Sequence, residues 1–417
     1  TGREFVAALA ARAREGVRVR VIYDWLGNLG ISRRLWKPLL DAGGEVRVFN
    51  PLRFASPFGW IVRDHRKMLA VDGRIGFVTG LCVSRKWLGD PGRGLQPWRD
   101  TGIEVRGPAV ADIERAFAET WAETGPPLKP EELTEPGSIP EAGDVAMRVL
   151  ATKPNRAGLY RLDQLIAAMA RERLWLTDAY FVGVAPYVQA LRSAARDGVD
   201  VRLLVPGSSD IPMLQPLSRV GYRPLLECGI RVFEWNGSML HAKTAVADGR
   251  WARVGSTNLN LSSWLGNYEL DIAVEDARFA GAMEEMYRDD LAHATEVVLD
   301  ARCRVCAPGE VAHRQVRGGG GSAARAAAGV LRIGNTVGAA IAGQRTLGAA
   351  EAGVMAGAAT LFLAASVVAM LWPIVFALPF GLIAGWSAIA LFLRARELRR
   401  STHPHVCPPG EEPVGPR

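Results

Sequence analysis

The chain has 417 residues, of which 49% are hydrophobic and 22% charged, and its formal net charge is +7. This length allows two globular modules and a further segment. From Arg317 onward, nine arginines and four glutamates give a net charge of +5, which leaves +2 for the preceding part. A surface that binds a nucleic-acid backbone normally carries a concentrated basic excess, so this distribution argues against nucleic acid as a partner. Five scattered cysteines, an odd number, favour free thiols in a reducing compartment.

An αβ unit occurs twice along the chain. Residues 3–24 have the pattern of a helix followed by a strand, and residues 186–206 repeat it. A second helix and strand follow at 39–49 and again at 225–233. The second repeat also has a helix and a strand upstream, over 162–181, for which the first has no counterpart. We therefore expect the chain to lack about 30 or more residues of its first module.

Each repeat then reaches the same short motif, in which a His is followed by a Lys two positions on and an Asp five positions further. These residues are His65, Lys67 and Asp72 in the first copy and His241, Lys243 and Asp248 in the second. After six intervening residues come Thr79-Gly80-Leu81-Cys82 and Gly255-Ser256-Thr257-Asn258. The coincidence of both spacings is far beyond chance.

The spacing has a physical interpretation. Residues i and i+2 of a strand point to one face, so the His and Lys of each copy are expected to project together. An imidazole can attack phosphorus or donate a proton near neutral pH, and a Lys beside it can hold a phosphate oxygen. The Asp-Gly pairs that follow predict hairpin turns, with Leu69, Val71, Ala245 and Ala247 continuing the strands into the core. The simpler alternative is that these are two buried strands whose His and Lys side chains are merely solvated at the strand ends. This alternative could account for the spacing in one copy, but its repetition in a second copy argues against it.

This pattern resembles the HKD motif of the phospholipase D superfamily, and within it the bacterial cardiolipin synthases. The resemblance covers nearly all of residues 1–300 and includes Arg63–Lys67, Leu240–Thr244 and Asn267–Glu269. It implies an α/β fold of two repeated mixed-sheet modules related by pseudo-twofold symmetry.

The first copy departs from the family pattern. Thr79 stands for the Gly, Gly80 for the Ser and Cys82 for the Asn of the turn. After the second turn, Asn260 and Ser262 stand where the family usually has Asp and Arg. We expect two active half-sites, of which the first binds phosphate with fewer side-chain donors.

The resemblance also implies roles for individual residues. One His, expected to be His65, forms a phosphohistidine, while His241 protonates the leaving alcohol and later deprotonates the incoming one. Asp100 and Glu269, which follow the two histidines at similar distances, hydrogen-bond the imidazoles in this scheme; the alternative for each is a surface acid near a turn. The expected phosphate-binding residues are Lys67, Lys243, Ser256 and Asn258. No metal or other cofactor is expected; a lone C-x-x-C at Cys303 and Cys306 is weak evidence for zinc.

The implied activity is that of a membrane-anchored phosphatidyltransferase, which converts two phosphatidylglycerols into cardiolipin and glycerol. The expected partners are therefore an anionic phospholipid substrate and a membrane, and not nucleic acid. The alternatives are a phospholipase D that uses water as the acceptor, a nuclease, and a lipid-binding protein that has lost activity.

The last part of the chain differs in character. No charged residue lies between Glu351 and Arg394, and these 42 positions would form a helix of about 60 Å, twice the hydrocarbon thickness. Two passes fit this length, and flanking arginines predict that both ends, and the catalytic part, are cytoplasmic at the cell membrane. A hairpin that dips into one leaflet and a buried soluble helical pair are the alternatives. Residues 323–349 are compatible with a helix on the membrane surface or a loose linker.

The expected organisation has seven parts. They are an N-terminally incomplete first HKD module over 1–122, a linker over 123–143, a second HKD module over 144–300, a flexible linker over 301–322, an Ala/Gly-rich juxtamembrane segment over 323–350, a transmembrane hairpin over 351–394, and a basic then Pro-rich tail over 395–417.

Overall fold

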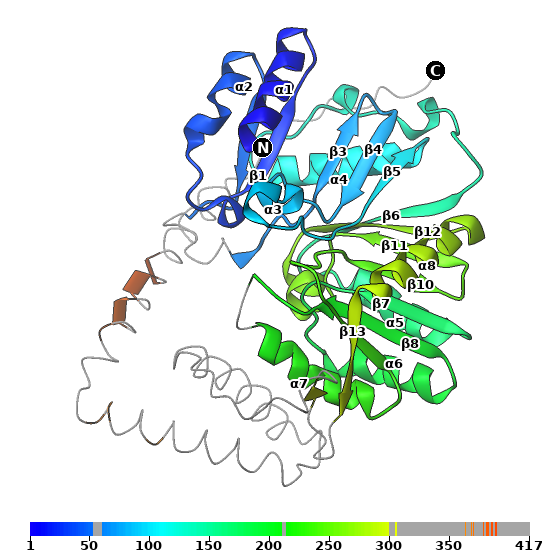
Figure 1. The fold of residues 1–417 in the computed structure, drawn as a ribbon. Coiled ribbons are helices and arrows are strands. Elements are labelled where there is room, and N and C mark those ends of the chain that lie inside the picture. Colours follow the sequence, from blue (N-terminus) through cyan, green and yellow to red (C-terminus); the bar gives the residue numbers. More distant parts are fainter. Residues whose placement is uncertain are drawn as a thin grey trace, which may run out of the picture.

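The computed structural model describes residues 1–52, 61–210, 214–299 and 305–306, with ten single positions between 363 and 389. The described part forms two αβ modules that pack against each other, the first drawn in blue to cyan and the second in green to yellow (Figure 1).

The second module is built on a nine-stranded mixed sheet in the order β14-β13-β9-β8-β7-β10-β11-β12-β6. Strands β7, β8 and β9 pair in parallel, and the other pairs are antiparallel. The strands are β6 (Ala146–Thr152), β7 (Arg173–Thr177), β8 (Asp200–Pro206), β9 (Arg231–Trp235), β10 (Thr244–Ala247), β11 (Trp251–Gly255), β12 (Glu269–Glu275), β13 (Ala294–Leu299) and β14 (Val305–Cys306).

Helices cover both faces of this sheet, as expected for a sheet with a parallel centre. One face packs on α5 (Gly158–Met169), α6 (Ala185–Arg196) and α7 (Leu214–Leu226) through a large apolar core. The other face packs on α8 (Ala277–Ala292). The apolar strands β7 and β8 are therefore buried on both sides, which explains their nearly continuous hydrophobic sequences.

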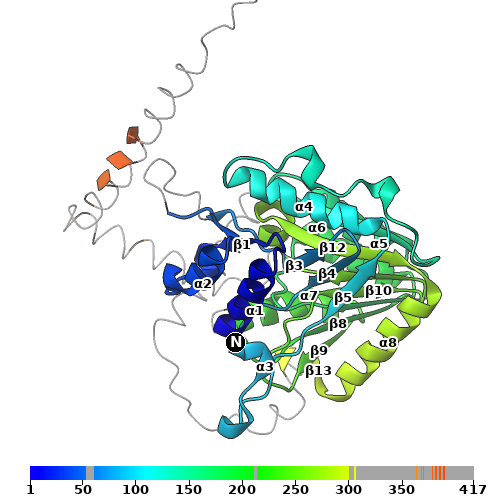
Figure 2. The same cartoon turned by 90° about the horizontal axis from the view of Figure 1, so that it is seen from above.

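The first module has two separate sheets. One is a parallel pair, β1 (Arg20–Asp24) and β2 (Glu45–Phe49), packed on α1 (Gly2–Arg14), η2 (Arg33–Trp36) and α2 (Lys37–Asp41), with η1 (Leu26–Asn28) after β1. The other is antiparallel and contains β3 (Met68–Val71), β4 (Ile75–Thr79) and β5 (Gly102–Arg106), with α4 (Ala109–Glu123) packed on it. Figure 2 shows the first module from above. The remaining short elements are α3 (Arg85–Leu88), η4 (Pro91–Arg93), η5 (Pro130–Glu132), η6 (Pro136–Ser138) and η7 (Ser262–Gly266).

The prediction of α/β modules with mixed sheets therefore holds for the second module, while the first is divided. In the second module, β7 lies between β8 and β10 and joins the parallel strands to the antiparallel ones. Within residues 1–52 and 61–123, no strand occupies the corresponding place between β1 and β3. As a result β3 lies at the edge of its sheet, whereas the equivalent β10 is central.

The predicted hairpin turns are present in both copies. Asp72 and Gly73 have φ of 54° and 61°, and Asp248 and Gly249 have φ of 51° and 60°. Two successive left-handed residues define the type I′ turn, whose twist matches that of the antiparallel strands it joins. These turns fix the register of β3 on β4 and of β10 on β11.

Two details of the strand prediction are wrong. Each His-Lys pair lies in the extended segment just before its strand, because the histidine backbone hydrogen-bonds to the other module. In the first copy, Leu69 and Val71 are exposed rather than buried, since β3 packs its other face on the core. Ala245 and Ala247 are buried as predicted.

The two modules are joined by an ion pair and by a continuous apolar core. In the ion pair, Arg99 in the loop before β5 donates to both carboxylate oxygens of Asp290 on α8 at 2.7 and 2.9 Å. The shared apolar cluster takes Val78, Val105, Val110, Ile113 and Ala116 from the first module and Leu270, Ile272 and Val274 from the second. Relative motion of the modules would break this cluster, so their common boundary is fixed.

The buried Arg66 side chain joins the modules through hydrogen bonds. Its guanidinium donates to Thr120 Oγ1 at 3.2 Å and to the Ala116 carbonyl, both on α4. It also donates to the carbonyl oxygens of Thr152 at 2.9 Å and Glu269 at 3.2 Å in the second module. The planar fork of an arginine can satisfy such divergent acceptors, which the single ammonium of a lysine cannot match.

Within the described part of the chain, no helix is long and apolar enough to cross a membrane. Apart from ten single positions, the expected hairpin over 351–394 lies outside the described residues, as do the segments 307–350 and 395–417. Among those ten positions are six large apolar side chains that are exposed, namely Leu363, Val368, Met370, Leu378, Leu382 and Ile389.

Replacing Arg66 should loosen the module boundary. Arg66→Met keeps much of the side-chain volume but leaves buried carbonyl oxygens without donors, at about 1–3 kcal/mol for each unsatisfied group. We expect a clear loss of stability in urea or thermal unfolding. Arg115→Met, which removes an exposed arginine of α4 paired with Asp112, is the matched control and should change stability little. Equal stability of the two variants would show that Arg66 does not hold the boundary.

Candidate active site

Each of the two motif histidines is hydrogen-bonded to a carboxylate of the other module. His65 Nδ1 of the first module lies 2.8 Å from Glu269 Oε2 of the second. His241 Nδ1 of the second module lies 2.9 Å from Asp100 Oδ2 of the first. The two predicted acids therefore contact the two predicted histidines, in crossed pairs.

The backbone sets this crossing. The His65 N–H donates to the Tyr268 carbonyl at 2.9 Å, so its imidazole lies beside the next residue, Glu269. In the same way the His241 N–H donates to the Arg99 carbonyl at 2.7 Å and its ring lies beside Asp100. Short parallel bridges at both places hold the strand ends of the two modules together. Neither half-site can therefore form from one module alone.

The Glu269 carboxylate is buried and receives further hydrogen bonds. Ser256 Oγ donates to its Oε2 at 2.6 Å, and Asn267 Nδ2 donates to its Oε1 at 3.2 Å. Ser256 was predicted to bind phosphate, but its hydroxyl is engaged by Glu269 and also accepts the Leu270 N–H at 2.9 Å. In this structure Ser256 therefore supports the carboxylate that orients His65.

Asp100 is supported differently, which accounts for one departure of the first motif. Trp87 Nε1 donates to Asp100 Oδ2 at 2.7 Å, and the Thr101 N–H donates to Oδ1 at 2.8 Å. A Cβ at Gly80, the position equivalent to Ser256, would lie 2.1 Å from Asp100 Oδ1. The carboxylate thus occupies the space that a serine side chain would need, and an indole N–H replaces the missing hydroxyl.

Both acids are held in the charged form. Burial alone would raise the pKa of Asp100, but the hydrogen bond from His241 and the charge of Lys243 lower it below its usual value. Burial opposes ionisation of Glu269 as well, and the interaction with His65 lowers its pKa. Because a charged carboxylate only accepts hydrogen bonds, we place a proton on Nδ1 of each ring, which leaves Nε2 as the free nitrogen.

The imidazoles themselves are held neutral. Burial lowers the pKa of His65, against the opposing effect of Glu269. Burial and then the positive charge of Lys243 lower the pKa of His241 to about 3. The His65 side chain is 17% exposed and that of His241 only 6%. The two rings therefore differ in accessibility, and the pKa of each is below the usual value.

Two lysines make the site an anion site. Lys67 Nζ donates to the His65 carbonyl at 2.6 Å. Lys243 Nζ donates to the His241 carbonyl and lies 2.9 Å from His241 Nδ1, where it competes with Asp100. Burial lowers the pKa of Lys243 to about 8, and the charge of Lys67 acts in the same direction. A bound anion would offset this repulsion.

Asn258 is the one predicted phosphate ligand with an unused buried acceptor. Its side chain is nearly buried, and Nδ2 donates to Ser263 Oγ at 3.4 Å. Its Oδ1 has no hydrogen-bond partner among the described residues. Rotation of the amide would exchange the two ends and turn a donor toward whatever Oδ1 now faces.

The motif aspartates lie away from the histidines. Asp248 follows β10, and its carboxylate accepts the backbone N–H groups of Arg171, Glu172 and Arg173 at 2.8–2.9 Å. Asp72 is exposed in the corresponding turn. The structure does not bring either residue to the imidazoles, and the contacts of Asp248 are those of a turn-stabilising side chain.

Sequence reasoning missed an aromatic wall around His241. The ring centroids of Trp87, Trp98 and Tyr180 lie 5.1, 5.7 and 5.7 Å from that of His241. It also missed Asp178, which is fully buried and accepts the backbone N–H groups of Leu259 and Tyr180. Burial raises the pKa of Asp178 to about 7. Their positions in the sequence could have indicated them. Trp98 lies two residues before Asp100, and Asp178 follows an apolar strand.

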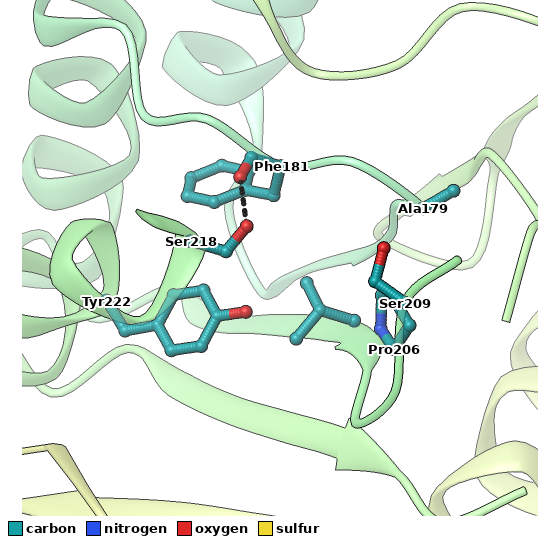
Figure 3. Close-up of a pocket in the computed structure, with 7 residues that line it drawn as sticks. Ala179, Phe181, Pro206, Ser209, Ser218 and Tyr222 are labelled. Atoms are coloured by element: carbon teal, nitrogen blue, oxygen red, sulfur yellow. Dashed lines mark hydrogen bonds between the residues drawn. The ribbon is translucent and has the colours of Figure 1, made fainter. Parts of the chain in front are cut away.

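A small cavity lies behind the segment that carries Tyr180. Ala179, Phe181, Pro206 and Tyr222 are among its lining residues, and Ser218 Oγ donates to the Phe181 carbonyl at its edge (Figure 3). Its volume of about 10 Å³ suits a single water molecule and no substrate. Within the described residues, no group of three or more His, Cys, Asp or Glu side chains is arranged to hold a metal ion.

Comparison with known proteins shows that the chain is similar to proteins named cardiolipin synthase. A model described as the PLD-like domain of cardiolipin synthase matches residues 163–291. Cardiolipin synthase A of Pseudomonas fluorescens is 36% identical over 306 residues, which are 71% of this chain and 62% of that protein. A cardiolipin synthase of Halalkalibacterium halodurans is 30% identical over 325 residues, 74% of this chain and 64% of that protein. The chain thus spans less than two thirds of the length of either relative.

The fold also has a solved counterpart. The crystal structure of a phosphatidylserine synthase from Haemophilus influenzae Rd KW20 superposes with a TM-score of 0.50 and covers 71% of this chain and 86% of that one. At 12% sequence identity, this likeness shows the α/β fold alone.

The low basicity of His241 can be tested directly. Lys243→Met removes the neighbouring charge but not the burial, so the pKa of His241 should rise from about 3 and stay below the ordinary value for histidine. A pH titration of the ¹⁵N-labelled imidazoles by NMR measures this shift. Lys153→Met, which removes a lysine paired with Glu119 outside the site, is the control. An ordinary pKa for His241 in the unsubstituted protein would contradict the electrostatic account.

Proposed function

Because the chain belongs to the phospholipase D superfamily, we propose that it is a membrane-anchored, cardiolipin synthase-like phosphatidyltransferase. The observation that carries this proposal is the pair of crossed His–carboxylate contacts, flanked by two lysines, at one module boundary. Two oriented imidazoles supply a nucleophile and a proton carrier, and the lysines supply positive charge for a phosphodiester. Complete pairs in both halves argue against a lipid-binding protein without activity.

His65 is the proposed nucleophile. Its side chain is the more exposed of the two, and Glu269 holds its Nδ1 so that Nε2 is free to attack. His241 is the proposed acid and base, with Asp100 in the orienting role. An acid works best when its pKa lies near the working pH, so this role requires the bound substrate to raise the pKa of His241.

The proposed reaction has two displacements at one phosphorus. His65 Nε2 attacks the phosphorus of phosphatidylglycerol, a P–N bond forms, and the P–O bond to the headgroup glycerol breaks. His241, which takes up a proton on Nε2 when the anionic substrate binds, gives this proton to the departing glycerol oxygen. It then takes the proton from a hydroxyl of a second phosphatidylglycerol, whose oxygen attacks the phosphohistidine. The P–N bond breaks, cardiolipin forms, and both rings return to their starting states.

Binding of the anionic substrate would prepare His241 for this role. In the free protein burial, and then the charge of the nearby Lys243, keep His241 neutral. A phosphodiester between the lysines contributes a negative charge, which offsets that repulsion and raises the pKa of His241. Lys67, Lys243 and Asn258 are the proposed ligands of the non-bridging oxygens, where negative charge must be accommodated in the transition state.

Membrane attachment is part of this proposal. The apolar stretch 351–394 is the proposed anchor, either as two spanning helices or as a hairpin in one leaflet. The six exposed apolar side chains among its described positions are compatible with contact to lipid. Arginines on both sides would keep the catalytic modules on the cytoplasmic side of the cell membrane.

Product analysis tests the reaction itself. The full chain, reconstituted in vesicles that contain phosphatidylglycerol, should produce cardiolipin and glycerol in equal amounts by mass spectrometry. His65→Ala should lower this rate by about a thousandfold or more, since it removes the nucleophile. Phosphatidic acid as the main product would instead identify a hydrolase, and would overturn the assignment as a transferase.

The roles of the two histidines can be separated by the leaving group. A short-chain p-nitrophenyl phosphodiester releases a weakly basic phenolate that needs no proton from an acid. We therefore expect His241→Ala and Asp100→Asn to retain a burst of p-nitrophenolate from formation of the phosphohistidine. His65→Ala and Glu269→Gln should lose or greatly reduce it. The reverse pattern, with the burst lost only in the His241 and Asp100 variants, would exchange the assigned roles.

A further inference from the structure

The loop over residues 81–97, here called the cap loop, combines two unusual surface properties. It carries four exposed large apolar side chains, with Leu88 63% and Leu95 58% exposed. It also contains one acid and three bases, and Arg85, Lys86 and Arg93 are all exposed. The other two apolar side chains are Leu81 and Val83.

The base of the cap loop is fixed to both modules. Lys86 Nζ lies 3.3 Å from Asp210 Oδ2 and sits 4.5 Å from the centroid of the Trp98 ring. Ser238 Oγ donates to the Pro97 carbonyl at 2.9 Å. In Figure 2, α3 and the blue turn that follows it project from the body of the protein. The loop is therefore a supported projection.

The inner side of the loop is part of the candidate active site. Trp87 donates to Asp100 and its ring contacts that of His241, while the next residue, Leu88, faces solvent. A molecule bound at Leu88 would thus be next to Trp87, which belongs to the aromatic wall around His241. The loop therefore influences which part of such a molecule could approach the imidazole.

The combination of exposed apolar and basic side chains matches the chemistry of an anionic lipid surface. Apolar side chains enter the boundary between headgroups and acyl chains, while Lys and Arg attract the phosphates. We propose that the cap loop is a membrane-docking element that inserts Leu88 and Leu95 into an anionic bilayer and brings a lipid phosphate to His241. This inference rests on the proposed lipid substrate, and it is separate from the C-terminal anchor.

The first test compares two substrates in the full chain. Leu88→Glu with Leu95→Glu is assayed in phosphatidylglycerol/phosphatidylcholine vesicles and on the soluble p-nitrophenyl phosphodiester. We expect the rate on vesicle lipid to fall by roughly tenfold or more, since charge disfavours insertion, and the rate on the soluble ester to stay within about twofold. Leu165→Glu with Met169→Glu, at similarly exposed positions of α5, is the control and should alter neither rate.

Unchanged turnover of vesicle lipid by the Leu88/Leu95 variant would overturn the proposal. Equal losses on both substrates would also overturn it, because they would indicate a structural role for the loop. If the unsubstituted chain acted on the soluble ester but on no lipid, the proposed function would fail.

The second test reads docking without activity. An environment-sensitive fluorophore is attached at Leu88→Cys in a chain whose five native cysteines are serine, and at Leu165→Cys as control. With the same vesicles, emission at position 88 should shift to the blue and be quenched by a lipid-borne quencher, while position 165 should not respond. No response at 88 would refute docking. A blue shift that needs no lipid and grows with protein concentration would assign the surface to a second copy and refute the lipid proposal.

Discussion

The crossed hydrogen bonds between histidines and carboxylates are the constraint on which the site depends. Each imidazole is oriented by an acid from the opposite module, so the site exists only where the two modules meet. The shared apolar core and the buried Arg66 then have a clear purpose, because a small displacement of one module would misalign both rings. The repeat in the sequence thus produces one composite site.

Electrostatics gives the site its preference for an anion. Two buried or partly buried lysines and two neutral imidazoles lie together with the two orienting carboxylates. Burial is the main reason why the pKa values of His241 and Lys243 are low, and repulsion from a neighbouring lysine lowers them further; a phosphodiester would relieve that repulsion. The difference between the two rings arises from unequal surroundings, since an aromatic wall covers His241 while His65 is more open.

The sequence was informative where local spacing decides geometry. The Asp-Gly turns could be predicted because each depends on a few neighbouring residues, whereas the two acids were expected from the family resemblance and their crossed pairing was not. It was not informative about partners distant in the chain. That Ser256 serves Glu269, that Trp87 replaces the hydroxyl lost at Gly80, and that β3 is an edge strand follow from contacts between segments far apart. Motif recognition has a limit of its own, which Asp248 illustrates. It belongs to the motif, but its carboxylate accepts backbone N–H groups and stabilises a turn.

The most direct test of the composite site is the NMR signal of the hydrogen-bonded imidazole protons. The account predicts two downfield Nδ1–H resonances, one from His65 and one from His241, in the resting protein. Glu269→Gln should shift or remove the His65 resonance alone, and Asp100→Asn the His241 resonance alone. If Asp100→Asn instead altered only the His65 proton, or if each histidine responded to the acid of its own module, the crossed arrangement would be contradicted.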